Sequence, residues 1–162
     1  MKNFLDQLDA ESLRILRRVG RQAEGAGLRA YVVGGCVRDL ILKRKVLDLD
    51  VVIEGDAIVV ARKFSSDRAG TLTVYPQFGT ATVLLPDGRA VDFASARRES
   101  YLHPGALPVV VKGNIKEDLF RRDFTINAMA VGINPKHFGS LLDYYGGFDD
   151  LKSQRIRVLH GQ

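Results

Sequence analysis

The stretch LDLDVVIEG, residues 47–55, constrains the fold of this chain more than any other segment. Its first four residues alternate apolar and acidic side chains, and residues 51–53 are then continuously apolar. A continuously apolar strand is typical of a sheet that is covered on both faces. The sequence therefore predicts a buried strand here, with Asp48 and Asp50 near its beginning.

A strand, a glycine turn and a helix precede this segment. RAYVV, residues 29–33, is short, aromatic and β-branched, and it leads through the glycine pair at 34–35 into the helical pattern CVRDLILK, residues 36–43. A glycine pair between two such patterns indicates a tight turn. Upstream, apolar residues recur at three- to five-residue spacing over 5–23, which predicts an amphipathic helix that Gly25 ends.

The remainder of the chain alternates between helix and strand patterns. Asp56 is a candidate N-cap for a helix over 56–68. The segment 97–114 holds two prolines and two glycines without a stable period, which predicts a long loop. The other expected elements are strands at 71–75, 80–85 and 89–96 with a hairpin turn at 86–88, a helix and then a strand over 115–133, and a short strand, a Gly-Gly turn and a short helix over 141–162.

Composition limits the class of protein. The 162 residues are 46% hydrophobic, enough for one domain with a core of its own. The single cysteine, Cys36, excludes an internal disulfide, and no apolar run approaches the roughly 20 residues that span a bilayer, so we expect a soluble, cytoplasmic protein without a signal peptide. A net charge of +5 favours, without requiring, a polyanionic partner.

Three aspartates are candidate catalytic residues. On a strand, residues i and i+2 share a face about 6 to 7 Å apart, so Asp48 and Asp50 can converge on one metal ion. Hard oxygen ligands without a His-Cys cluster favour Mg²⁺ or Mn²⁺ over zinc. The alternative for this pair is the solvated face of an edge strand. Asp92 alternates with Val91 and Phe93 on another predicted strand, and it is either a third carboxylate of the same site or a surface residue.

The first glycine turn suits a phosphate group. Gly34 and Gly35 allow backbone N–H groups to approach a phosphate closely, and Arg38 lies one helical turn further along the chain. A tight turn without a ligand is the alternative. We interpret Cys36 as a small buried hydrophobe, because no base or second thiol accompanies it.

A second basic cluster lies in LFRRDFTINAMA, where Arg121 and Arg122 stand beside Asp123 and Asn127 follows. Arginine forks match phosphate oxygens, so the two arginines and Asn127 are candidate nucleotide-binding residues. An ion pair between Asp123 and one arginine would explain part of the pattern equally well. The glycine pair at 146–147 is interpreted as a turn only, and the three histidines show no pattern.

Together, GGCVRD, LDLD and RRDFTINAMA, in this order, resemble the head domain of the bacterial poly(A) polymerase and class II tRNA CCA-adding nucleotidyltransferase family. The resemblance covers residues 28–162, leaves residues 1–27 as an N-terminal helix, and implies an α+β, polymerase-beta-like nucleotidyltransferase fold in which a small mixed sheet is backed by helices. It implies that Gly35 and Arg38 bind a nucleoside triphosphate, that Asp48 and Asp50 bind two Mg²⁺ ions, and that Arg121 and Arg122 lie beside the nucleotide.

The activity that this resemblance implies is template-independent addition of C, A or both to an RNA 3′ end. ATP and CTP are the expected donors, a tRNA 3′ end is the expected acceptor, and two-metal displacement of pyrophosphate is the expected mechanism. The family continues into neck, body and tail domains, which we expect this chain to lack. CCA, CC-only, A-only and poly(A) addition therefore stay open. A nucleotide- or RNA-binding module with little or no turnover is the alternative from another class.

Overall fold

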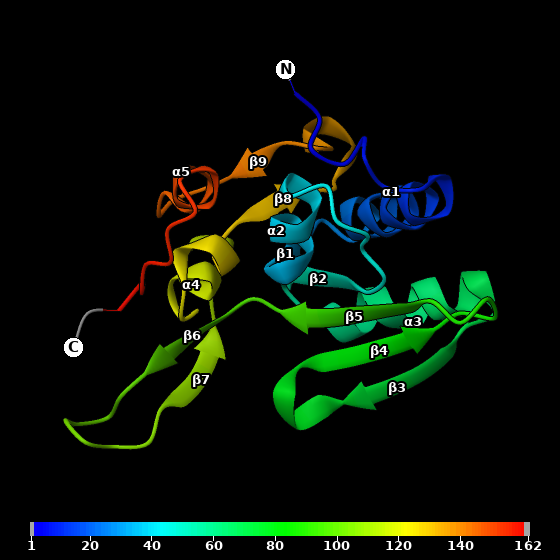
Figure 1. Cartoon of the computed structure of the whole chain (residues 1–162). Coiled ribbons are helices and arrows are strands. Elements are labelled where there is room, and N and C mark those ends of the chain that lie inside the picture. Colours follow the sequence, from blue (N-terminus) through cyan, green and yellow to red (C-terminus); the bar gives the residue numbers. More distant parts are fainter. Residues whose placement is uncertain (1, 161–162) are drawn as a thin grey trace.

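The computed structural model describes residues 2–160 and is built around a mixed β-sheet with the strand order β3-β4-β5-β2-β1-β8-β9 (Figure 1). Strands β2 and β5 run parallel, and the other neighbouring strands of this sheet run antiparallel. The sheet strands are β1 (Arg29–Val33), β2 (Leu49–Glu54), β3 (Thr71–Tyr75), β4 (Thr80–Leu84), β5 (Ala90–Ser95), β8 (Ala130–Gly132) and β9 (Leu141–Leu142). The mixed sheet backed by helices confirms the predicted fold class.

Helices cover both faces of the centre of this sheet. The α-helices are α1 (Ala10–Gly25), α2 (Gly35–Ile41), α3 (Ala57–Arg68), α4 (Ile115–Phe120) and α5 (Gly147–Lys152). Val51 and Ile53 of β2 belong to the apolar core that α1, α2 and α3 complete, whereas Val52 points to the opposite face and packs in a cluster with Ile115 and Leu119 of α4. The continuously apolar part of β2 is therefore buried on both sides, as its sequence predicts. Asp50 lies on the same face as Val52, because side chains alternate along a strand.

Helix α1 begins later than its sequence pattern predicts. Leu5 and Leu8 are buried in the same core, but they lie in turns before Ala10. The carboxylate of Asp9 accepts hydrogen bonds from the backbone N–H groups of Glu11 and Ser12, so the helix is capped at this point and the apolar period continues across a turn. The predicted cap of α3 is confirmed, since Asp56 accepts a hydrogen bond from the Ile58 N–H at 3.0 Å.

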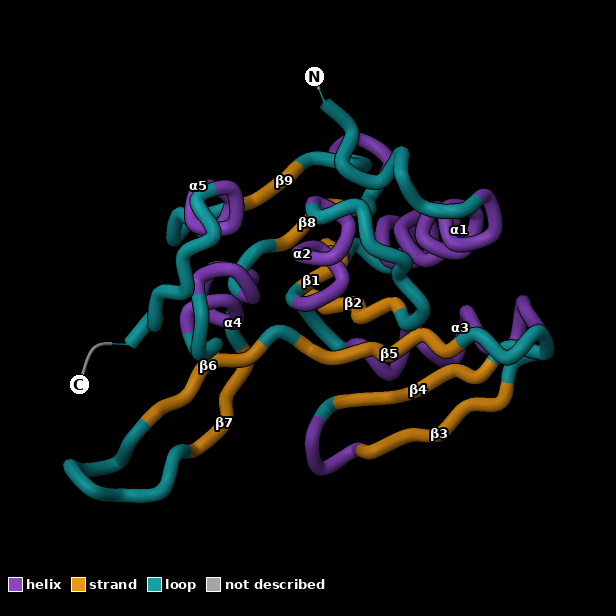
Figure 2. Tube along the Cα trace, viewed as in Figure 1, coloured by secondary structure: helices purple, strands orange, loops and turns teal. Residues whose placement is uncertain are grey.

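The prediction of a long loop over 97–114 was wrong. Strands β6 (Arg97–Ser100) and β7 (Val109–Lys112) pair antiparallel and form a separate two-stranded ribbon that extends away from the main sheet (Figure 2). Both faces of the ribbon are largely exposed, so its strands have no alternation of apolar and polar residues to reveal them. Within this range, loop is confined to the connection at 101–108 and to residues 113–114.

Short 3₁₀ helices lie between the other elements, at Pro76–Phe78, Thr125–Asn127 and Pro135–His137. In the tail, β9 is followed by Gly146 with φ 77° and then by α5, as predicted. A Cβ atom on Gly147 would collide with the carbonyl oxygen of Thr125, so the second glycine allows α5 to pack against the 3₁₀ helix at 125–127. Within residues 2–160, no helix has both the length and the apolarity that a membrane crossing requires.

Candidate active site

Asp50 and Asp92 lie side by side at the centre of the sheet. They are register partners on the parallel strands β2 and β5, and adjacent strands are about 4.8 Å apart. Both line a cavity of about 230 Å³, together with Arg122 and Thr82. The hydroxyl of Thr82 donates a hydrogen bond to Oδ1 of Asp92 at 2.6 Å, which fixes this carboxylate. The strand pairing therefore places Asp92 beside Asp50, a neighbourhood that no local sequence pattern could establish.

The pKa of Asp50 is raised above its ordinary value. The main cause is partial desolvation of the carboxylate by the cavity walls, although the residue keeps contact with solvent. The negative charge of Asp92 raises the pKa further. Asp48 adds a smaller contribution of the same sign, whereas Arg122 acts in the opposite direction. The site thus concentrates negative charge at a point where that charge is disfavoured without a cation.

The donor set at this point suits a hard divalent cation that is shared with a ligand. Among residues 2–160, no three His, Cys, Asp or Glu side chains gather closely enough to hold a metal ion by themselves. Asp50 and Asp92 supply carboxylate oxygens, and Mg²⁺ typically uses one or two carboxylates together with waters and substrate phosphates. Asp48 precedes β2 and lines a separate depression with Lys45 and Arg89. It does not line the cavity of Asp50 and Asp92, and it acts on Asp50 through its charge.

The glycine turn brings distant parts of the chain together. Gly34 has φ 68° and ψ −134°, and its N–H donates to the carbonyl of Met129 at 3.1 Å. A Cβ atom on Gly34 would lie 2.8 Å from Nη1 of Arg122, so the missing side chain leaves room for this guanidinium. Gly34 and Arg122, which the sequence places 88 positions apart, are thus neighbours.

Arg38 is held from two sides. Its Nη1 donates to Oδ1 of Asn127 at 2.8 Å, and its Nε donates to Oδ1 of Asp39 at 3.0 Å. Its Nη2 faces the backbone of Gly35, where a Cβ atom would lie 3.4 Å away. Asn127 therefore positions Arg38 next to the glycine turn, and the predicted nucleotide-binding residues form one connected group.

A buried carboxylate that the sequence did not single out organises the second basic cluster. Asp118 of α4 is 0% exposed and lies 3.3 Å from Nη2 of Arg122 and 3.5 Å from the guanidinium of Arg121. The alternative ion pair with Asp123 was wrong, because both arginines pair with Asp118 instead. The sequence contained one indication of these pairs, because Asp118 precedes the two arginines by three and four residues, the spacing at which side chains meet along a helix.

This cluster carries excess positive charge. Asp118 also accepts a hydrogen bond from the backbone N–H of Arg97 at 3.1 Å, and burial together with the charge of Arg121 lowers the pKa of Arg97. The Nε atoms of Arg121 and Arg122 are buried without a hydrogen-bond partner. Two guanidinium groups paired with one carboxylate, with that of Arg97 close enough to interact with them by charge, favour a further anion nearby.

Cys36 takes no part in this chemistry. It is buried in the core, and burial raises the pKa of its thiol to about 12. A thiol with such a pKa stays protonated at neutral pH and is a poor nucleophile. The prediction of a small buried hydrophobe is confirmed.

Comparison with known proteins identifies the family. The model of the poly A polymerase head domain matches residues 30–157. The chain belongs to this family. Among curated relatives, it is 50% identical over 133 residues to an A-adding tRNA nucleotidyltransferase of Aquifex aeolicus, which covers 82% of this chain and 16% of that protein. It is 37% identical over 154 residues to a CC-adding tRNA nucleotidyltransferase of Deinococcus radiodurans, covering 95% of this chain and 41% of that protein.

Solved structures agree with the family and confirm the predicted nucleotidyltransferase fold. An apo structure of a CCA-adding enzyme superimposes with a TM-score of 0.90 and 44% sequence identity. The match covers 97% of this chain and 37% of the enzyme's chain. The Thermotoga maritima CCA-adding enzyme in complex with tRNA matches 97% of this chain and 35% of its own with a TM-score of 0.83 and 41% identity. This chain thus spans less than half the length of each of these relatives. Nucleotidyltransferases of this family generally use a divalent metal.

Proposed function

We propose that this chain transfers a nucleotide from ATP or CTP to the 3′ end of a tRNA. The pairing of Asp50 with Asp92 in one cavity, beside Arg122 and the glycine turn, carries this proposal. In the reaction, the 3′ oxygen of the RNA forms a bond to the α-phosphorus, and the bond from that phosphorus to pyrophosphate breaks. Carboxylates and guanidinium groups at one point are the combination that such a transfer needs.

Asp50 and Asp92 would hold the cation, with Asp48 as a further ligand, and Mg²⁺ is the ion we propose, with Mn²⁺ as a substitute. A bound divalent cation would neutralise phosphate charge and favour ionisation of the attacking hydroxyl. Thr82 would keep the carboxylate of Asp92 in a fixed orientation through its hydrogen bond of 2.6 Å. The charge of the cation would also remove the repulsion that raises the pKa of Asp50.

The groups next to the carboxylates would hold the triphosphate. Gly34 and Gly35 leave the backbone of the turn open to a phosphate, and Arg38, fixed by Asn127, would contact its oxygens. Arg122 lines the cavity of the two aspartates, so its guanidinium would neutralise charge on the departing pyrophosphate. Arg121, which shares the buried carboxylate Asp118, adds positive charge to the same region.

Related structures support both substrates. CCA-adding enzymes have been solved with ATP, with CTP and with tRNA, and each of these structures is more than 40% identical to this chain. The relatives include A-adding, CC-adding and CCA-adding enzymes, so the base that this chain adds stays open. We also propose that residues 28–162 are the nucleotidyltransferase head, with residues 1–27 as an N-terminal extension, and that the protein is cytoplasmic.

Incorporation of labelled nucleotide tests the proposed function. The chain is incubated with Mg²⁺, a tRNA without its 3′ end, and ATP or CTP labelled at the α-phosphate, each nucleotide separately. We expect labelled tRNA, and no label with the Asp50→Asn or Asp92→Asn chain. Saturable nucleotide binding without incorporation would instead identify a binding module, and long tails of A on unrelated RNA would identify a poly(A) polymerase.

A further inference from the structure

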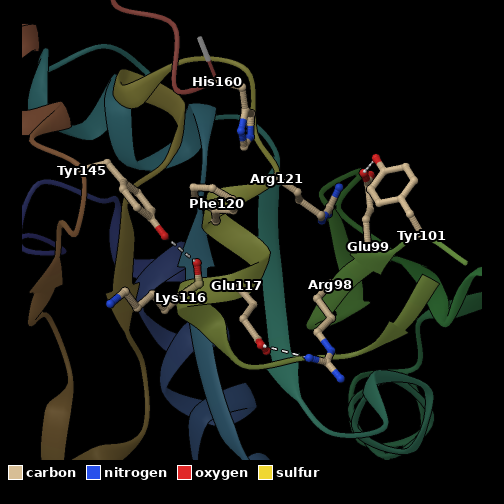
Figure 3. Close-up of a pocket in the computed structure, with 9 residues that line it drawn as sticks. All are labelled: Arg98, Glu99, Tyr101, Lys116, Glu117, Phe120, Arg121, Tyr145 and His160. Atoms are coloured by element: carbon tan, nitrogen blue, oxygen red, sulfur yellow. Dashed lines mark hydrogen bonds and ion pairs between the residues drawn. The ribbon is translucent and has the colours of Figure 1, made fainter. Parts of the chain in front are cut away.

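A second cavity, larger than that of the aspartates, lies between α4 and the β6–β7 ribbon. Its volume is about 690 Å³. Figure 3 shows the rings of Phe120, Tyr145 and His160 on the α4 side together with the charged Lys116 and Glu117, and Arg98, Glu99 and Tyr101 on the ribbon side. None of the proposed nucleotide- and metal-binding residues lines it except Arg121. The function proposed above therefore leaves most of this cavity without a role.

The aromatic wall is built around an exposed ring. Phe120, the last residue of α4, is 51% exposed, although a phenylalanine ring is one of the most apolar side chains. The ring of Tyr145 lies 5.8 Å from it at 44°, and the ring of His160 lies 4.7 Å from it edge-on. The hydroxyl of Tyr145 donates to the carbonyl of Lys116 at 3.0 Å, which fixes the tyrosine against α4. Exposed, supported rings of this kind offer a flat surface for stacking.

The same cavity is lined by three cationic side chains, Arg98, Lys116 and Arg121, and by the two carboxylates of Glu99 and Glu117. Arg98 of β6 is 58% exposed and only 3.8 Å from the carboxylate of Glu117, so this weak pair across the cavity leaves most of its donors free. Lys116 lies with its Nζ 5.5 Å above the ring of Tyr144 and is also part of the lining. Aromatic faces combined with arginine and lysine are the features that bind single-stranded nucleic acid, because bases stack while the cations contact the phosphates.

The position of the cavity relative to the aspartates points to the acceptor and not to the donor nucleotide. Arg121 lines the aromatic cavity and Arg122 lines the cavity of Asp50 and Asp92, and Asp118 pairs with both. The two cavities thus lie on either side of one arginine pair. A transfer reaction brings together a triphosphate, which suits the acidic cavity with its cation, and an RNA end, for which the neighbouring cavity is free.

We propose that the unpaired 3′ end of the acceptor RNA stacks on Phe120 in this cavity, with its backbone next to Arg98 and Lys116. This inference rests on the proposed function, because it assigns the place of that reaction's second substrate. Stacking on Phe120 holds the strand beside the arginine pair, and the terminal hydroxyl can then approach the aspartates. Every base has a stacking face, so this contact is expected to be tolerant of sequence.

A tryptophan reporter tests stacking directly, because the chain contains no tryptophan. The Phe120→Trp chain is titrated with a short single-stranded oligoribonucleotide, and indole fluorescence is recorded. We expect saturable quenching, and much weaker quenching by the same oligoribonucleotide with an abasic 3′-terminal residue. Phe78→Trp is the matched control, since Phe78 is 59% exposed but does not line this cavity, and its fluorescence should stay unchanged.

Affinity provides the second measurement. Phe120→Ala should weaken binding of the fluorescein-labelled oligoribonucleotide about tenfold by anisotropy, the loss typical of one base stack, and leave calorimetric affinity for CTP·Mg²⁺ unchanged. Phe78→Ala should change neither. Unchanged RNA affinity in Phe120→Ala, or quenching of Phe120→Trp by CTP·Mg²⁺ in place of RNA, would overturn the inference.

The two proposals fail in different ways. Transfer to tRNA that is as efficient in Phe120→Ala as in the unmodified chain, at limiting RNA, rejects the stacking site and leaves the proposed function intact. Quenching by RNA in a chain that incorporates no nucleotide supports the stacking site and rejects the proposed transfer. Circular dichroism of each variant shows whether the fold is kept, and the tryptophan variant retains an aromatic ring at this exposed position.

Discussion

At Asp50, the charge that the proposed reaction needs is also a charge that the fold disfavours. Burial by the cavity walls and the neighbouring Asp92 raise the pKa of Asp50. Replacing either carboxylate with an amide of the same shape removes this repulsion together with a metal ligand. We therefore expect Asp50→Asn and Asp92→Asn to lower the rate of transfer at least about a hundredfold while the chain stays folded. Incorporation of labelled nucleotide and circular dichroism measure the two effects, and near-normal transfer by either variant would reject the metal assignment.

The raised pKa of Asp50 also predicts how stability depends on pH. An aspartate with an ordinary pKa of about 4 in the unfolded chain and a higher pKa in the folded chain binds its proton more tightly when folded. Stability is therefore lost as pH rises from the ordinary to the raised pKa, and regained as pH falls through the same interval. Without metal, Asp50→Asn should have the higher melting temperature at pH 7, and the difference should shrink in acid. A melting temperature below that of the unmodified chain at pH 7 would contradict the direction of the shift.

Asp118 is the residue on which the arginine pair depends. Removing one partner of a buried charge pair typically costs about 3 to 5 kcal/mol, because the other charges stay buried without compensation. Asp118→Asn should therefore lower the free energy of unfolding by about 3 kcal/mol in urea and weaken CTP·Mg²⁺ binding, since Arg121 and Arg122 lose their common anchor. Asp123→Asn is the control for stability, because the Asp123 side chain is exposed. Equal losses of unfolding free energy in the two variants would show that the pairing of Asp118 with the two arginines does not stabilise the fold.

At the scale of elements, contacts local in sequence could be predicted and contacts between distant strands could not. The apolar run of β2 and the glycine turn before α2 each depend on a few adjacent residues, and their patterns predicted both. The partnership of Asp92 with Asp50 depends on which strand lies beside β2, and no residue near either aspartate encodes that choice. The β6–β7 ribbon was not predicted for a related reason. Its two strands are largely exposed and pair with each other, so they need no alternation of apolar and polar residues.

Sequence patterns missed Asp118 and Phe120 for two different reasons. Asp118 is three and four positions before its arginines, a spacing that also occurs on ordinary solvated helix faces. Phe120 gains its proposed role from Tyr145 and His160, which lie 25 and 40 positions further along the chain. His160 has no neighbours in sequence that suggest a site, and only the fold of the tail brings its ring to α4.

The contact between α5 and the 3₁₀ helix at 125–127 gives an element-scale prediction. A Cβ atom on Gly147 would collide with the Thr125 carbonyl, and the same 3₁₀ helix carries Asn127, the partner of Arg38. Gly147→Ala should destabilise the chain by about 1 to 3 kcal/mol, the usual range for overpacking. Gly25→Ala is the matched control, because a Cβ atom at the end of α1 meets nothing within 4 Å. Urea denaturation of both variants measures the difference, and equal stabilities would show that α5 adjusts without strain.

At the scale of the whole molecule, the two cavities and the helices around the sheet form one body. Helix α1 precedes the residues that match the family, yet Ile15, Leu16 and Val19 lie in the same core as β1 and β2. Asp50 and Asp92 project from the opposite face of the sheet, the face that carries α4. Helix α4 carries Asp118, which pairs with Arg122 of the aspartate cavity, and Phe120, which lines the aromatic cavity. A shift of this one helix would therefore affect both proposed substrates together.

Base selection is the property that the described groups provide least. The charged side chains that line the cavity are the carboxylates of Asp50 and Asp92 and the guanidinium of Arg122, and the hydroxyls of Tyr75, Thr80 and Thr82 lie beside them. The charged groups suit phosphate and its cation, which every nucleoside triphosphate shares. Discrimination between bases needs donors and acceptors at the base edge. We therefore expect the chain to bind CTP, ATP, GTP and UTP with Mg²⁺ at similar affinity, and its RNA binding to fall steeply with salt. Calorimetry with the four nucleotides at one ionic strength measures this, and a tenfold preference for one of them, about 1.4 kcal/mol, would show that this head domain selects the base itself.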